Sequence, residues 1–150
     1  MSKRGSFAIV NPEHDVANEL DDLPLGNARF PELVKAVFNL EKVLSAQTKL
    51  CIRENMQENH DADIRPPSSH CAVNCDAQFT PHVDSGRGNG QQLSMIVGLG
   101  NYSGGELFIE GRSYDIRYKA LEFDGWKLRH WTAPFSGQRF SLVWFTPDMD

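Results

Sequence analysis

The sequence lacks the features that mark membrane proteins, secreted proteins and most nucleic-acid-binding proteins. It contains no run of about 18 apolar residues, so we expect no transmembrane helix and no membrane partner. Its first residues carry no apolar stretch of the secretory kind, which predicts an intracellular, soluble protein, either nuclear or cytoplasmic. Lysine and arginine number 15 against 20 acidic residues, and a net charge of -5 is the opposite of the basic footprint that nucleic-acid binding usually leaves.

Cysteine is also scarce, and repeats and low-complexity tracts are absent. Three cysteines are an odd number and form no disulfide framework, which fits a reducing compartment. A chain of 150 residues is long enough for one compact domain that buries roughly two-thirds of the surface of the unfolded chain. We therefore expect a single domain over residues 1–150.

Two kinds of pattern divide the chain near residue 68. Residues 1–68 are expected to form a helix and loops, with a short strand at most near 7–10 and a charged loop or lid over 53–67. The helix is predicted over 31–46, where a proline suits the first helical position and an apolar stripe would pack outside the core. Over 69–147, strand and turn signals recur about every eight to twelve residues, as in β-sandwiches and barrels. The candidate strands cover 93–99, 106–110, 114–118, 120–123, 127–132 and 139–146.

A histidine and a carboxylate, His82 and Asp84, are separated by a single residue. On extended backbone alternate side chains point the same way, so both would face one site. A second histidine, His130, shares the predicted inward face of its strand with Leu128 and Thr132. Two imidazoles and one carboxylate can occupy one face of an Fe(II) octahedron and leave three positions for a co-substrate and dioxygen, although Mn(II), Co(II) and Ni(II) accept the same ligands. The three residues therefore predict a metal site suited to oxidation.

The last predicted strand is apolar except for Arg139 and Ser141, which share a face. An arginine taken into a protein interior needs an anionic partner, since an unpaired buried charge costs several kcal/mol. Guanidinium pairs bidentately with a carboxylate, and a neighbouring hydroxyl adds one more donor. We expect these two side chains to hold one end of a dicarboxylate whose other end chelates the metal.

Taken together, His82-x-Asp84, His130 and Arg139-x-Ser141 resemble the signature of the Fe(II)/2-oxoglutarate-dependent dioxygenases. Within that superfamily, residues 74–84 and 97–107 most resemble the TET/JBP-like branch, and the resemblance extends from about residue 69 to residue 147. Prolyl hydroxylases share the turn and strand type of residues 104–107 but usually have lysine where this chain has Arg139. Base-repair dioxygenases of the AlkB type carry a second arginine where this chain has Phe145.

The resemblance implies a mainly β fold, a double-stranded β-helix of the jelly-roll or cupin-like kind, with one or two N-terminal helices packed outside. It implies that His82, Asp84 and His130 bind iron and that Arg139 and Ser141 hold the distal carboxylate of 2-oxoglutarate. The implied reaction consumes 2-oxoglutarate and O2, is supported by ascorbate as a reductant, and hydroxylates a substrate C–H bond. In the TET/JBP branch that bond belongs to the methyl group of 5-methylcytosine or thymine, in a base flipped out of its stack.

The substrate stays open at this point. A protein side chain or a small metabolite is the alternative substrate, and a non-catalytic metal-binding barrel used as a binding module is the alternative function. Asn74, Gln78 and Asn89 are candidate substrate contacts because polar groups beside the histidine–aspartate pair would meet a polar substrate. Basic residues that would form a local patch for a nucleic acid are Arg87, Arg112, Arg117, Lys119, Lys127 and Arg129.

Overall fold

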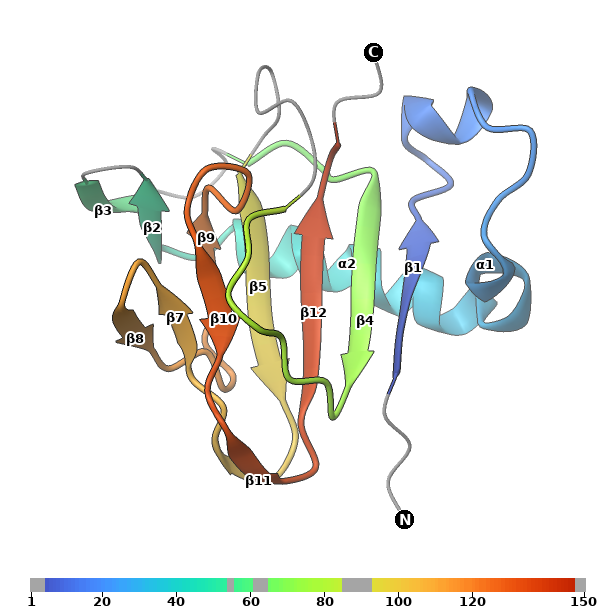
Figure 1. Ribbon diagram of the computed structural model, residues 1–150. Helices are drawn as coiled ribbons and strands as arrows, with labels where there is room; N and C mark the ends of the chain where they lie inside the picture. Colours follow the sequence, from blue (N-terminus) through green and yellow to red (C-terminus); the bar gives the residue numbers. More distant parts are fainter. Residues whose placement is uncertain (1–4, 54–55, 61–64, 85–92, 148–150) are drawn as a thin grey trace.

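The structure, a computed structural model, describes residues 5–53, 56–60, 65–84 and 93–147. It is mainly β, with a 3-10 helix (Asp15–Asn18) and two α-helices, α1 (Leu25–Arg29) and α2 (Pro31–Ser45) (Figure 1). The strands are β1 (Gly5–Val10), β2 (Lys49–Arg53), β3 (Met56–His60), β4 (His70–Cys75), β5 (Ser94–Leu99), β6 (Tyr102–Gly104), β7 (Leu107–Ile109), β8 (Arg112–Tyr114), β9 (Leu121–Phe123), β10 (His130–Thr132), β11 (Phe135–Gly137) and β12 (Phe140–Phe145).

Two layers of sheet form the core. The large sheet has seven strands in the order β1-β4-β12-β5-β9-β2-β3, and the pairing of β2 with β9 is parallel. The small sheet has the order β10-β7-β8. A two-stranded sheet, β11-β6, continues the β10–β7 ladder in the same register, since Ile109 opposes His130 and Gly104 opposes Phe135. An isolated antiparallel bridge between His82 and His130 adds one more segment to the free edge of β10.

The strand order is that of a jelly roll. The first and last strands of the β core, β4 and β12, are neighbours in the large sheet. The second segment, at His82, is the neighbour of β10 in the opposite layer, and β10 with its continuation β11 comes directly before β12 in the chain. This interleaving of early and late strands is the double-sheet arrangement in which two Greek keys cover each other's apolar faces. The predicted fold class is therefore confirmed.

Helix α2 covers the outer face of the large sheet, behind β5, β12 and β4 as drawn in Figure 1. Pro31 stands at its first turn, where the missing N–H costs no hydrogen bond. The helix packs Val34, Val37 and Phe38 against the outer side chains of the sheet, and the indole of Trp144 donates to the Val37 carbonyl at 3.1 Å. The predicted helix over 31–46 and its outside position are confirmed. In the described part of the chain, no helix is long and apolar enough to cross a membrane.

The structure corrects the expectation that residues 53–67 form only a loop or lid. Strand β3 pairs antiparallel with β2, and β1 and β2 also join the large sheet, so the first 68 residues contribute strands as well as the helix. β3 lies at the edge of the sheet, where pairing requires backbone groups but no alternation of apolar and polar side chains. Its sequence is polar, so the search for apolar alternation did not detect it as a strand. The sequence patterns also did not reveal β4, β6 and β11. They predicted a strand at 114–118, whereas β8 covers Arg112–Tyr114 and so ends where the predicted strand begins.

Buried charges connect α2 to the large sheet. The guanidinium of Arg65 donates to Glu41 of α2 at 3.1 Å and to Glu122 of β9 at 3.2 Å, and Lys49 lies 3.6 Å from Glu122. All four side chains are nearly inaccessible to solvent. Two cations and two carboxylates thus balance one another on the outer side of the sheet.

Candidate functional site

A cavity of about 370 Å³ lies between the large sheet and the small one. Its walls include all five residues expected at the metal and co-substrate sites: His82, Asp84, His130, Arg139 and Ser141. They come from three separate parts of the chain, which the jelly-roll order brings together. The cavity is therefore the candidate functional site.

The two histidines form a cross-strand pair. The backbone N–H of His82 donates to the carbonyl of His130 at 3.1 Å, and the N–H of His130 donates back at 2.9 Å. Their ring centroids are 4.4 Å apart. Directly paired residues of antiparallel strands project to the same side of the sheet, so this bridge sets the two imidazoles side by side over the cavity.

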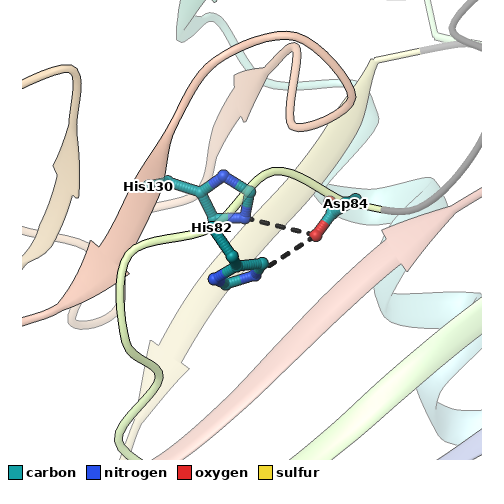
Figure 2. Close-up of side chains that lie close together, drawn as sticks. All are labelled: His82, Asp84 and His130. Carbon is teal, nitrogen blue, oxygen red and sulfur yellow. Dashed lines mark ion pairs between the residues drawn. The ribbon is translucent and has the colours of Figure 1, made fainter.

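Backbone carbonyls orient both imidazoles. Nδ1 of His82 lies 2.7 Å from the Thr80 carbonyl, and Nδ1 of His130 lies 2.9 Å from the Leu128 carbonyl. A carbonyl oxygen only accepts hydrogen bonds, so the proton of each neutral ring sits on Nδ1 and the lone pair on Nε2. Each Nε2 lies 3.4 Å from Oδ1 of Asp84. Figure 2 draws both contacts as dashed lines. Both histidines thus present their free nitrogen to the same carboxylate.

A glycine gives the Asp84 carboxylate its space. The Asp84 N–H donates to the Gly125 carbonyl at 2.8 Å. A Cβ at position 125 would lie 2.5 Å from Oδ2 of Asp84 and 3.4 Å from Cε1 of His130. A side chain here would therefore displace the carboxylate. Nothing in the local sequence around Gly125 indicates this contact.

The environment of His130 favours positive charge at its ring. Burial acts to lower the pKa of His130. The Asp84 carboxylate, which accepts a hydrogen bond from Nε2 once the ring is protonated, and the Leu128 carbonyl act against burial, and the pKa is raised above its usual value. The same negative charge that stabilises a proton on the ring stabilises a metal cation beside it.

The three side chains fit a divalent transition metal. Their potential ligand atoms all lie within 4.8 Å of one another, and among the described residues no other group of three or more such side chains gathers in this way. Two imidazole nitrogens and one carboxylate oxygen on one side of an ion leave its other positions open to a co-substrate and dioxygen, which is the ligand set of non-haem Fe(II) oxygenases. Carbonyl-bonded Nδ1 atoms are the usual outer support of such ligands.

Arg139 is buried at the polar end of the cavity. Its side chain donates to the Gly105 carbonyl from Nε at 3.2 Å and from Nη2 at 3.1 Å. The rings of Tyr102 and Phe135 flank the guanidinium at 5.6 and 5.7 Å. Its backbone N–H donates to Oδ1 of Asp76 at 2.7 Å, which anchors the residue from behind. Within the described ranges, no carboxylate lies at ion-pair distance from this guanidinium.

This arrangement leaves a charge to be neutralised. Burial lowers the pKa of Arg139 from its usual value, because the charged form loses hydration that no carboxylate of the described residues replaces. Ser141, two residues further on, faces the same cavity and is 2% exposed. An anion that enters the cavity would meet a guanidinium and a hydroxyl at the same end.

The three candidate substrate contacts have different positions. Asn74 lines the cavity, and its Nδ2 donates to Oγ of Ser141 at 3.0 Å. Gln78 is exposed and is not among the lining residues. Asn89 lies outside the described residues.

Gly105 is a further site residue that the sequence marked only as a turn: its φ is +69°, and a Cβ there would lie 2.8 Å from Nε of Arg139.

Comparisons with known proteins give distant likenesses. No family model matches the sequence, and no curated protein matches it significantly. An oxidoreductase of the 2OG-Fe(II) oxygenase family from Burkholderia pseudomallei is 22% identical, with a TM-score of 0.37, over 52% of this chain and 43% of that one. A prolyl-4-hydroxylase from Pseudomonas putida is 14% identical, with a TM-score of 0.39, over 99% of this chain and 73% of that one. The chain thus spans less than half of the first protein, and the function has to be argued from the cavity itself.

Proposed function

We propose that this chain is an Fe(II)- and 2-oxoglutarate-dependent dioxygenase that hydroxylates a substrate C–H bond. One observation carries the proposal: a single cavity holds a histidine–aspartate–histidine cluster and a buried arginine that no carboxylate of the described residues neutralises. A metal site alone fits many functions, and a buried arginine alone is often structural. Their convergence on one cavity fits a ligand that has a chelating end and an anionic end.

Each of these residues has a role in the proposed site. His82 and His130 would hold the metal through Nε2, and Asp84 through its carboxylate. The metal would supply the activation of O2 that is coupled to the decarboxylation of 2-oxoglutarate to succinate. Arg139 and Ser141 would bind the distal carboxylate and so fix which way the co-substrate points into the site.

The inner face of β12 divides the cavity into two halves. Arg139 precedes the strand, and Ser141, Val143 and Phe145 then follow at alternate positions, all of them lining the cavity. The first half is therefore polar and suits the co-substrate. The second half is apolar and also contains Phe123 from β9. We propose that the substrate group entering there is uncharged, since apolar walls offer no partner to a charge.

The methyl group of a pyrimidine, as in the TET/JBP branch, is one candidate substrate. Two of the basic side chains that would serve a nucleic acid already have local partners. Arg117 donates to the Gly100 carbonyl at 2.9 Å, and Lys119 lies 3.4 Å from Asp115. Together with the net charge of -5, this favours a protein side chain or a small metabolite at least as well.

The test separates co-substrate binding from turnover. Anaerobic protein loaded with Fe(II) is titrated with 2-oxoglutarate, and we expect the visible charge-transfer absorption of an iron–2-oxo acid chelate. Admission of O2 with ascorbate should then yield succinate. The His130→Ala variant serves as control and should show neither signal. A wild-type protein that binds Fe(II) but gives no chelate absorption would refute the proposed co-substrate and leave a metal-binding module.

The substrate class is tested separately. Oligonucleotides with 5-methylcytosine or thymine, peptides and metabolite mixtures are incubated with the active protein and examined by mass spectrometry for the gain of one oxygen. Oxygen gained by the methylated bases would support the pyrimidine methyl group as substrate. Oxygen gained by peptides or metabolites, with unchanged oligonucleotides, would exclude it.

A further inference from the structure

Asn74 and Ser141 face each other across two neighbouring strands. In the antiparallel register of β4 and β12, Asn74 is the direct partner of Ser141. Both side chains line the cavity, and they are 3% and 2% exposed. Nδ2 of Asn74 donates to Oγ of Ser141 at 3.0 Å. Asn74 therefore meets the co-substrate end of the cavity through the hydroxyl that is proposed to bind the distal carboxylate.

This hydrogen bond decides what the hydroxyl can do. A serine hydroxyl has one proton to donate and two lone pairs that accept. Because Asn74 donates to the oxygen, the serine proton is left for an acceptor elsewhere. Ser141 shares the inner face with Arg139, where an anion is expected. A hydroxyl without such a partner rotates among three staggered positions, of which only some direct its proton at the ligand.

We infer that Asn74 is a positioning residue of the co-substrate site, whose carboxamide fixes the Ser141 hydroxyl as a donor to the distal carboxylate of 2-oxoglutarate. The inference rests on the proposed function and extends it. It gives Asn74 a role different from the substrate contact expected from its place beside the histidine–aspartate pair. Asn74 acts through Ser141, so its effect on binding depends on the presence of that hydroxyl.

Two other roles for Asn74 lead to different results. If Asn74 bound the carboxylate itself, its removal and the removal of Ser141 would weaken binding independently. If it only supported the β4–β12 pairing, its removal would disturb every ligand of the cavity alike. Comparing two ligands and combining two substitutions separates these cases.

The experiment measures dissociation constants by anaerobic calorimetry on the Fe(II)-loaded protein. The ligands are 2-oxoglutarate and oxalate, which also chelates a metal but has no distal carboxylate. The proteins are wild type, Asn74→Ala, Asn74→Asp, Ser141→Ala and the Asn74→Ala/Ser141→Ala double variant. Thermal unfolding of each variant checks the fold. Asn74→Asp has nearly the shape of asparagine and serves as the test if Asn74→Ala does not fold.

We expect Ser141→Ala to weaken 2-oxoglutarate binding about twentyfold, as loss of a hydrogen bond to a charged group does, and Asn74→Ala about fivefold. The double variant should bind no more weakly than Ser141→Ala. Asn74→Asp should weaken binding by on the order of a hundredfold, because its carboxylate accepts the serine proton and adds negative charge beside the ligand. Oxalate binding should change less than about twofold in the Asn74 variants.

Three outcomes would overturn the inference while the proposed function stands: unchanged 2-oxoglutarate binding in the Asn74 variants, additive losses in the double variant, or an equal loss of oxalate binding. Failure of the proposed function is distinct from all three. In that case the wild-type protein itself binds Fe(II) and oxalate but does not bind 2-oxoglutarate.

Discussion

Two buried arginines lie on opposite faces of the large sheet, and they differ in what surrounds them. Arg65, on the outer face, contacts Glu41 and Glu122, donates to Oγ of Ser68 at 2.6 Å and to the Trp144 carbonyl at 3.2 Å. Arg139, on the inner face, donates from its guanidinium to the Gly105 carbonyl, and no carboxylate of the described residues lies at ion-pair distance from it. They are 8% and 2% exposed, so burial does not distinguish them.

The difference is one of charge balance. A buried charge is tolerated when carboxylates and hydrogen bonds replace the lost hydration, and Arg65 has both. Arg139 has aromatic rings on two sides and a cavity in front. The charge of a structural arginine is neutralised by carboxylates of the protein itself, whereas the charge of an arginine that binds a ligand is neutralised by the anionic group of the ligand. The comparison therefore assigns stability to the outer face and recognition to the inner one.

Removing Arg65 should have the largest effect on stability. Arg65→Met leaves the carboxylates of Glu41 and Glu122 buried with less compensation, and we expect the free energy of unfolding to fall by about 3–5 kcal/mol. Urea denaturation followed by circular dichroism measures this loss. In the fraction that remains folded, the dissociation constant of 2-oxoglutarate should stay close to that of the wild type. A large loss of affinity without a loss of stability would contradict the assignment of Arg65 to the outer face.

Removing Arg139 should weaken co-substrate binding strongly and change stability little, the opposite of what is expected for Arg65. Arg139→Met takes away a charge that no carboxylate of the described residues neutralises, so the free energy of unfolding should change by less than about 1 kcal/mol. The affinity for 2-oxoglutarate should fall by at least about a hundredfold, because the distal carboxylate loses its charged partner. Calorimetry on the Fe(II)-loaded protein measures the affinity, and oxalate is the control ligand. If Arg139→Met proved as destabilising as Arg65→Met, the two arginines would both be structural.

A smaller effect, on the affinity for the metal, is expected from a substitution beside Asp84. The methyl group of Gly125→Ala would meet Oδ2 of Asp84, so the carboxylate must move. We expect the affinity for Fe(II) to fall about ten- to a hundredfold, the usual cost of disturbing the outer support of a metal ligand. Gly5→Ala is the matched control, since a Cβ there would meet nothing within 4 Å. Equal metal affinities in the two variants would show that Asp84 tolerates the displacement.

The two faces of the large sheet also differ in how much of their structure the sequence predicts. His82, Asp84, Arg139 and Ser141 were predictable because side chains alternate along extended backbone, so a spacing of two residues reveals a shared face. The position of His130 opposite His82 depends on a bridge between distant segments, and no local spacing specifies its register. The contact of Gly125 with Asp84 is equally non-local.

Arg65 illustrates a different limit. It lies in a polar, charged segment that the sequence suggested to be a loop or lid, and its partners are 24 and 57 residues away along the chain. Charged residues are common in solvated loops, so composition cannot tell which of them the fold will bury. An arginine in an apolar strand can be recognised from the sequence as a buried charge, but an arginine in a polar segment cannot. This is why the inner arginine was predictable and the outer one was not.

The smallest effect on stability is expected in the outer network, the buried charges of Lys49, Arg65, Glu41 and Glu122 on the outer face of the large sheet. In this network two cations contact the same carboxylate, that of Glu122. Lys49 lies 3.6 Å from Oε1 of Glu122, whereas Arg65 contacts Oε2 of the same carboxylate at 3.2 Å. In Lys49→Met, Arg65 still neutralises Glu122, so we expect the free energy of unfolding to fall by only about 1–2 kcal/mol. Combined with Arg65→Met, the loss should exceed the sum of the single losses, because in each single variant the other cation still compensates the Glu122 carboxylate, whereas the double variant removes both of these cations. Urea denaturation of the two single variants and the double variant measures this coupling. Simple additivity would mean that the two cations do not share Glu122, and the outer face would then hold separate ion pairs instead of one network.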